Sequence, residues 1–188
     1  MADDDRINKA FQEVKRSNFL LKSEKSLADI DSALYIGYGQ TISQPTTVRM
    51  MLEWLDAQPG DKVLDVGSGS GWSTALLANI VGSKGTVYAV ERVPELVEFG
   101  KSNCQEAGIT NAEFHKAGGT FGLPEHAPFD RILVSADASK LPDELMDQLN
   151  GGGKMVIPVN DVIYEVTKLS KTKNDIKKHP YFIFVPLI

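Results

Sequence analysis

The sequence predicts an α/β fold in which helices cover one mostly parallel sheet. After residue 60, apolar strand-like runs alternate with stretches that have helical apolar spacing, and the first run ends in a glycine-rich turn. Toward the C-terminus the alternation stops, and strand-like runs follow one another directly. We therefore expect a doubly wound, Rossmann-like sheet that ends in a C-terminal antiparallel hairpin, with a short helical cover at the N-terminus.

The composition predicts one domain. With 188 residues, of which 42% are hydrophobic, the chain is long enough to bury one sizeable core and short for two. We expect a single domain over 1–188. Within it, residues 1–44 form the N-terminal helical cover and a functional loop, and residues 45–188 form the Rossmann-like core.

Charge and cysteine content narrow the function classes. A net charge of −5 disfavours general binding to nucleic acid or to an anionic membrane, because both need a positive field. The single cysteine suits a reducing compartment, and the three histidines lack the spacing of metal ligands. No apolar run approaches the length of a membrane span. We expect a cytoplasmic monomer without metal, nucleic-acid or membrane partners.

The first 60 residues are predicted to hold two helices. Apolar residues at helical spacing favour a short amphipathic helix over 6–16, and one helical turn is expected near 26–30. The segment 34–45 is interpreted as a loop, because it is too rich in glycine for a strand. Ser43 is predicted to cap a second helix whose first turn contains Pro45, and from the residues alone this cap is its favoured role.

The remaining elements follow from the period of the apolar residues. A triplet of glycines, 151–153, is expected to stop the last helix. The predicted helices are 72–81, 94–107 and 142–149, and the predicted strands are 62–66, 86–90, 112–115, 131–135, 155–159, 162–169 and 181–185.

Two carboxylates frame the glycine turn. Asp65 lies at the end of the strand before Gly67, Gly69 and Gly71, and Glu91 ends the next apolar strand. A dinucleotide-binding turn would need a small residue where this chain has a tryptophan, and a carboxylate there would repel a pyrophosphate. Asp65 is instead predicted to attract the cationic end of S-adenosylmethionine, and Glu91 to accept hydrogen bonds from its ribose. A turn that only joins strand to helix is the alternative.

The sequence resembles the protein-L-isoaspartate O-methyltransferases from about residue 31 to residue 187. The most specific element of the resemblance is the Gly-Gln-Thr-Ile-Ser run at 39–43, because many methyltransferases share the glycine turn. The other elements are 63–71, 90–96, 127–132, 148–159 and 184–187.

The resemblance implies an S-adenosylmethionine-dependent enzyme that methylates the carboxylate of L-isoaspartyl residues in damaged proteins or peptides. It implies that Ser43 is the active-site hydroxyl. It also implies a cofactor site formed by Gln40, Thr41, Ile42, Asp65, Gly67, Ser68, Gly69, Glu91, Arg92, Gly118 and Gly119.

The chain departs from the family pattern at several positions, including Tyr35 and Ser139 where prolines are usual, and two departures bear directly on the site. Gly118 stands where the family has an aspartate near the adenine, and Asp137 stands at a family alanine near the methyl acceptor. A negative charge beside the acceptor would disfavour an anionic substrate. Two alternatives therefore stay open, a methyltransferase with another acceptor and a cofactor-binding module with little turnover.

Overall fold

The structure, a computed structural model, describes residues 2–187 and, within them, the side chains from residue 5 onward. The helices are α1 (Ala2–Glu13), α2 (Pro45–Leu55), α3 (Trp72–Val81), α4 (Pro94–Glu106) and α5 (Asp143–Gln148), with 3₁₀ turns at Arg16–Phe19, Lys25–Leu27, Gly82–Lys84 and Pro124–His126. The strands are β1 (Leu34–Gly37), β2 (Gln40–Ile42), β3 (Lys62–Val66), β4 (Thr86–Glu91), β5 (Ala112–Lys116), β6 (Phe129–Val134), β7 (Leu149–Val159), β8 (Val162–Lys168) and β9 (Asn174–Pro180).

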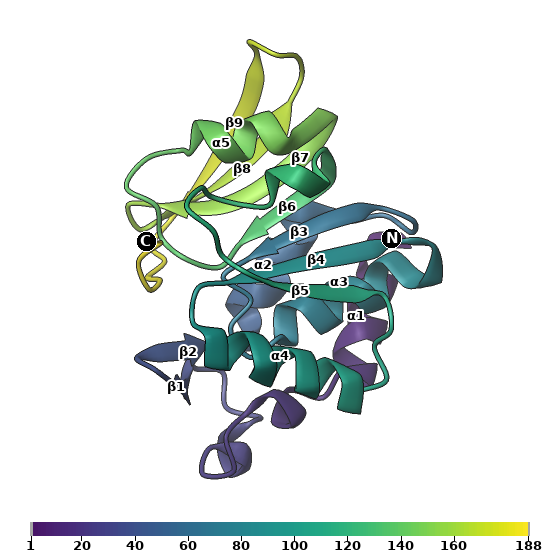
Figure 1. Ribbon diagram of the computed structural model, residues 1–188, viewed down its shortest axis with the longest axis vertical. Coiled ribbons are helices and arrows are strands. Elements are labelled where there is room, and N and C mark those ends of the chain that lie inside the picture. Colours follow the sequence, from purple (N-terminus) through teal and green to yellow (C-terminus); the bar gives the residue numbers. More distant parts are fainter. Residues whose placement is uncertain (1, 188) are drawn as a thin grey trace.

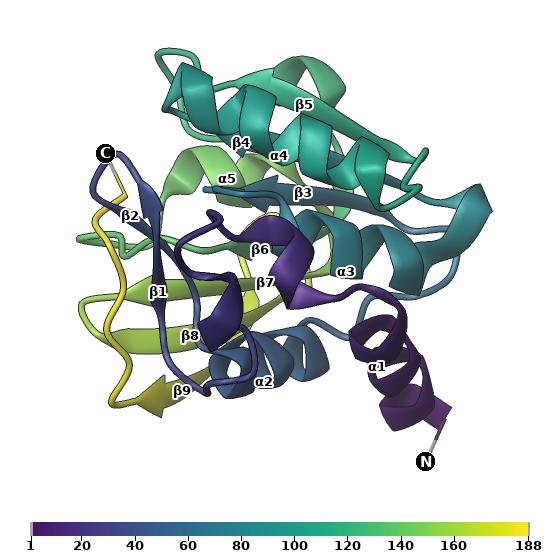
Figure 2. The same ribbon diagram turned by 90° about the horizontal axis from the view of Figure 1, so that it is seen from below.

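The main sheet has seven strands in the order β5-β4-β3-β6-β7-β8-β9. The strands from β3 to β7 in chain order all run parallel. Strand β8 pairs antiparallel with β7, and β9 pairs antiparallel with β8, so the predicted sheet class is confirmed. Figures 1 and 2 show α5 on the opposite side of this sheet from α2 and α3. Strands β4 and β6 lie on opposite sides of β3, so the chain changes direction across the sheet at β3. In folds of this class, ligands bind in the crevice at the carboxyl end of the strand where this change occurs.

Apolar residues on both faces of the sheet form the core. The face under α1 to α4 contributes Val63, Val87 and Leu133, and the opposite face under α5 contributes Leu64 and Ile132. Burial on both faces explains why the central strands read as continuous apolar runs in the sequence. No helix within residues 2–187 is long and apolar enough to cross a lipid bilayer.

The segment predicted as a loop contains a second, two-stranded sheet. Strand β1 pairs antiparallel with β2, and the side chains of Leu34, Ile36 and Ile42 are buried. The loop prediction was wrong because the glycines serve the turn of this hairpin. Gly37 and Gly39 both have positive φ, a conformation that glycine adopts without steric cost.

Two predictions near the C-terminus were also wrong. The glycine triplet does not separate a helix from a strand, because β7 already begins at Leu149 and runs through it. The β6–β7 register shifts here, and a Cβ on Gly153 would lie 2.9 Å from the carbonyl oxygen of Asp130, so the glycines permit a bulge. The last strand is Asn174–Pro180 rather than 181–185.

Candidate active site

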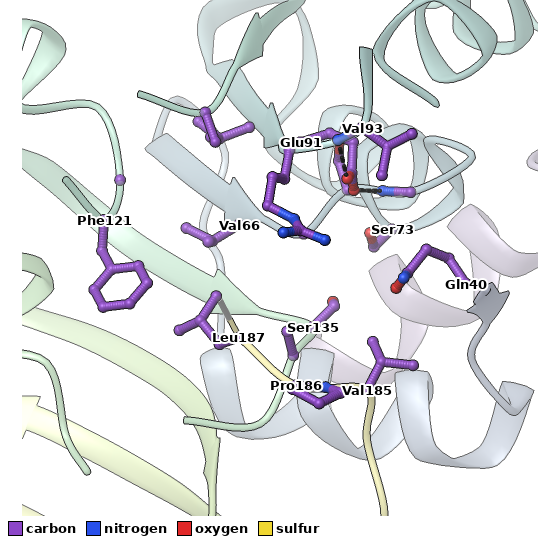
Figure 3. A pocket seen from close by; sticks show the side chains of 18 of the residues that line it. Gln40, Val66, Ser73, Glu91, Val93, Phe121, Ser135, Val185, Pro186 and Leu187 are labelled. Atoms are coloured by element: carbon purple, nitrogen blue, oxygen red, sulfur yellow. Dashed lines mark hydrogen bonds between the residues drawn. The ribbon is translucent and has the colours of Figure 1, made fainter. Parts of the chain in front are cut away.

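A cavity of about 350 Å³ lies at the carboxyl ends of the central strands. Its walls come from the β1–β2 hairpin, the glycine turn after β3, the end of β4, the loop after β5 and the last described residues of the chain (Figure 3). All predicted site residues except Asp65 line it, namely Gln40, Thr41, Ile42, Ser43, Gly67, Ser68, Gly69, Glu91, Arg92, Gly118 and Gly119.

The glycine turn is held tightly between β3, β4 and α4. Gly67, Gly69 and Gly71 all have positive φ, and the amide of Gly67 donates to the carbonyl oxygen of Val90 at 2.8 Å. A Cβ on Gly71 would lie 2.9 Å from the carbonyl oxygen of Gly100 in α4. Close backbone approach on one side and a ligand cavity on the other are the two reasons for this glycine pattern.

Glu91 is fixed at the end of β4 by two backbone amides. Its Oε2 accepts a 2.9 Å hydrogen bond from Gly69, and its Oε1 accepts one of the same length from Val93 (Figure 3). Each carboxylate oxygen can accept a further bond from a ligand hydroxyl. The Gly69 amide is already engaged by a carboxylate, so a pyrophosphate would meet a negative charge at this position.

Asp65 does not line the cavity, which differs from its predicted place beside the ligand. Its carboxylate is fully buried, and its Oδ2 accepts hydrogen bonds from the hydroxyls of Ser73 at 2.8 Å and Thr74 at 2.7 Å. Its Oδ1 has no partner among the described residues. Ser73 does line the cavity, so Asp65 reaches the site through that hydroxyl.

Burial raises the pKa of Asp65 to about 6, and the nearby charge of Glu91 adds to this effect against the two hydroxyl hydrogen bonds. An aspartate in the unfolded chain has a pKa near 4. Between about pH 4 and 6 the Asp65 carboxyl is therefore protonated in the folded protein and ionised in the unfolded chain. The stability from this group is present below about pH 4 and is lost as the pH rises through 6.

The Asp65→Asn variant should remove this pH dependence, because an amide oxygen still accepts from both hydroxyls. We expect the unfolding free energy of the parent, minus that of the variant, to fall by about 3 kcal/mol between pH 4 and pH 8. Urea unfolding of both proteins across this range measures the difference. A difference that stays constant with pH would contradict the assignment.

Ser43 lines the cavity and is not the cap of α2. The N-cap is Gln44, and the backbone amide of Thr46 donates to Oδ1 of Asp31 at 2.8 Å. The predicted cap was wrong because a residue from a distant part of the chain takes that role. The Ser43 hydroxyl makes no hydrogen bond with any described residue, and it is available to a ligand.

Asp137 is not among the residues that line the cavity, although the neighbouring Ala136 is. The Oδ1 of Asp137 accepts a 3.3 Å hydrogen bond from the amide of Asp161. Its backbone instead binds the end of the chain: Asp137 donates to Val185 at 2.7 Å and accepts from Leu187 at 2.8 Å. Asp137 therefore anchors one wall of the site.

Several lining residues were not predicted. Apart from Glu144 they are mainly apolar or small residues from several separate segments, and their spacing carries no chemical signal of its own. They include Val48, Val66, Trp72, Ser73, Val93, Phe121, Ser135, Val185, Pro186 and Leu187. Only the run 184–187, part of the family resemblance, could have pointed to the C-terminal wall.

Gly118 has room for a side chain. A Cβ built there meets nothing within 4 Å, and the residue does not need a positive φ. Gly118→Asp is therefore expected to fold normally and to add a hydrogen-bond acceptor to the cavity. We expect it to tighten S-adenosylhomocysteine binding by roughly tenfold, the effect of one hydrogen bond to a charged group. Calorimetry on both proteins decides the question, and weaker binding would contradict the expectation.

The chain is similar along its whole length to proteins of one family. The family model described as protein-L-isoaspartate (D-aspartate) O-methyltransferase matches residues 1–188. A protein-L-isoaspartate O-methyltransferase of Thermococcus onnurineus is 45% identical over 190 residues, covering 98% of this chain and 86% of the relative. One of Pyrococcus horikoshii is 43% identical, covering 98% of this chain and 85% of the relative.

Solved structures agree with this assignment. A protein-L-isoaspartate O-methyltransferase structure matches with a TM-score of 0.89 at 30% identity, covering 99% of this chain and 62% of the solved one. A putative member from Plasmodium falciparum, in complex with S-adenosyl-L-homocysteine, matches with a TM-score of 0.87 at 30% identity, covering 99% and 91%. The chain therefore belongs to the protein-L-isoaspartate (D-aspartate) O-methyltransferase family.

Proposed function

We propose that this protein transfers a methyl group from S-adenosylmethionine to the carboxylate of L-isoaspartyl residues in damaged proteins or peptides. One observation carries the proposal. The Ser43 hydroxyl, which has no partner among the described residues, lines the same cavity as the glycine turn and the fixed carboxylate of Glu91. A group that can orient an acceptor thus shares a cavity with groups suited to an adenosine cofactor.

The cavity fits S-adenosylmethionine by its size and its chemistry. Its volume of about 350 Å³ lies within the range of small-molecule sites. Glu91 would accept hydrogen bonds from the ribose, and Val66 and Val93 offer apolar contacts. Ser68 supplies a buried hydroxyl that has no partner among the described residues. When bound, the cofactor supplies an electrophilic methyl group on a positively charged sulfur.

The protein's own contribution is to position the acceptor. An isoaspartyl carboxylate is ionised at pH 7, so the site needs no general base. The hydroxyl of Ser43 donates a hydrogen bond to one carboxylate oxygen and orients the other for attack. The apolar wall that includes Val185 and Leu187 excludes water, which would otherwise compete. The backbone amide nitrogen of the following residue then attacks the methyl ester, which closes to a succinimide with loss of methanol and without further help from the protein, and hydrolysis of that ring returns some normal aspartate.

The test compares two peptides that differ only at one residue. The protein is incubated with methyl-labelled S-adenosylmethionine and an isoaspartyl peptide, and in parallel with its normal aspartyl twin. We expect base-labile label on the isoaspartyl peptide alone. Label on neither peptide, together with tight S-adenosylhomocysteine binding by calorimetry, would favour a different acceptor or a binding module.

We further propose that the protein acts as a single-domain monomer in the cytoplasm, with protein or peptide substrates and without nucleic acid. The cavity supports a monomer, because one chain supplies all of its described lining. The net charge of −5 supports the absence of a nucleic-acid partner, and the single buried cysteine supports a reducing compartment. Sedimentation of the purified protein measures the oligomeric state.

A further inference from the structure

Arg16 is buried, and it clamps the segment 28–43, which ends at Ser43, by binding backbone carbonyl oxygens of that segment. The residue begins the first 3₁₀ turn, and its guanidinium lies 5.5 Å from the centre of the Trp72 ring, which lines the cavity. Its two terminal nitrogens donate to four carbonyl oxygens, those of Ala28 and Ile30 at 3.1 Å, Ser32 at 2.7 Å and Ser43 at 3.1 Å.

Asp31 lies within the segment that Arg16 clamps and binds the start of α2. Its Oδ1 accepts from the amide of Thr46 at 2.8 Å, and its Oδ2 accepts from the Thr46 hydroxyl at 2.8 Å and from Nε2 of Gln44 at 2.9 Å. The bonds from Gln44 and Thr46 lower the pKa of Asp31, and the charge of Arg16 adds to them. The carboxylate therefore stays ionised at neutral pH.

Ser43 is thus held from both sides without using its side chain. Arg16 binds its carbonyl oxygen, and Asp31 binds the residues at the start of the following helix. Because Asp31 supplies the helix cap, the Ser43 hydroxyl does not have to turn back toward the Thr46 amide. We propose that Arg16 and Asp31 are positioning residues that fix Ser43 so that its hydroxyl faces the methyl acceptor.

The planar guanidinium is suited to this role, and a lysine is not. Arginine carries four N–H groups on its terminal nitrogens, which matches the four carbonyl oxygens around Arg16. Lysine has three donors on one nitrogen and cannot span the same acceptors. Arg16→Lys therefore keeps the charge while it releases part of the clamp, and Asp31→Asn replaces an acceptor oxygen with a donor.

The matched control is Arg49→Lys. Arg49 also ties the N-terminal cover to α2, through a 2.8 Å hydrogen bond to Oδ1 of Asn8 and a ring contact with Phe11 at 4.5 Å. Arg49 is not among the described residues that line the cavity. We expect Arg16→Lys and Asp31→Asn to lower kcat with an isoaspartyl peptide by roughly 10- to 100-fold, and Arg49→Lys to leave it unchanged. Affinity for S-adenosylhomocysteine should change by less than about twofold in all three.

A double-mutant cycle separates positioning from general destabilisation. If Arg16 and Asp31 act through Ser43, each substitution should change kcat by less than about threefold when made in a Ser43→Ala background. An undiminished loss in that background would overturn the proposal, as would an unchanged kcat in Arg16→Lys and Asp31→Asn. If Arg16→Lys does not fold, as judged by circular dichroism, the exposed Asp31 carries the test alone.

The inference rests on the proposed function, and the two can fail separately. A parent protein that methylates no isoaspartyl peptide would overturn both. A parent that methylates the isoaspartyl peptide, with Arg16→Lys and Asp31→Asn variants that do so equally fast, would overturn the positioning role and leave the proposed function in place.

Discussion

Replacing Ser43 with alanine is expected to lower kcat/KM for an isoaspartyl peptide by roughly 10- to 100-fold, the value of a hydrogen bond to a charged group. Melting temperature and S-adenosylhomocysteine affinity should barely change. Gln44 rather than Ser43 occupies the N-cap of α2, and the Thr46 amide is bound by Asp31, so no cap is lost. Steady-state kinetics with thermal melts and calorimetry measure the three quantities.

The control for this experiment is Ser43→Thr, which keeps a hydroxyl at the same position. It should retain much of the activity that alanine loses, provided that its extra methyl group fits the half-buried site. Full activity in Ser43→Ala would show that the hydroxyl does not contact the acceptor. A large drop in melting temperature would show instead that the residue is structural.

Gly71→Ala is expected to destabilise the fold by about 3 kcal/mol or more, because it combines backbone strain with a steric clash. Gly71 has φ +87°, and an added Cβ would lie 2.9 Å from the carbonyl oxygen and 3.0 Å from Cα of Gly100. Both contacts are with backbone atoms of α4, which cannot move aside as a flexible side chain could. The melting temperature should fall by roughly 6 to 12 °C.

Gly118→Ala is the matched control for Gly71→Ala. The same methyl group at Gly118 meets nothing within 4 Å, so the unfolding free energy should change by less than about 0.5 kcal/mol. Thermal melts of the two variants test the difference. Equal stability in both would mean that the turn and α4 separate at little cost.

Local patterns in the sequence predicted the centre of the fold well. Strand β3 and helix α3 begin and end where the apolar spacing placed them, and the glycine turn joins them. These elements depend on neighbours within a few residues, because the side-chain period and the conformational freedom of glycine are local properties. The same reasoning correctly placed Glu91 beside the turn, since parallel strands end at one edge of a sheet.

Local patterns misled where one residue type can serve two structures. Glycines mark loops, but Gly37 and Gly39 form the turn of a hairpin, and 151–153 form a bulge inside β7. Which of these occurs depends on whether a partner strand is present. A partner strand is a property of the assembled sheet and leaves no trace in a short window of sequence.

The sequence by itself determined the fold class, the turn at 67–71 and the polar and glycine residues on three sides of the cavity. Only the tertiary structure decided how four groups are used: Asp65 turns toward Ser73, Asp137 anchors Leu187, Asp31 caps α2, and Ser43 is left free. Each of these roles depends on a contact between residues that are distant in the chain or on the burial of a side chain. Such contacts form only when the whole core packs. Packing removes these polar groups from water, and a buried polar group is stable only where the fold places a hydrogen-bond partner beside it.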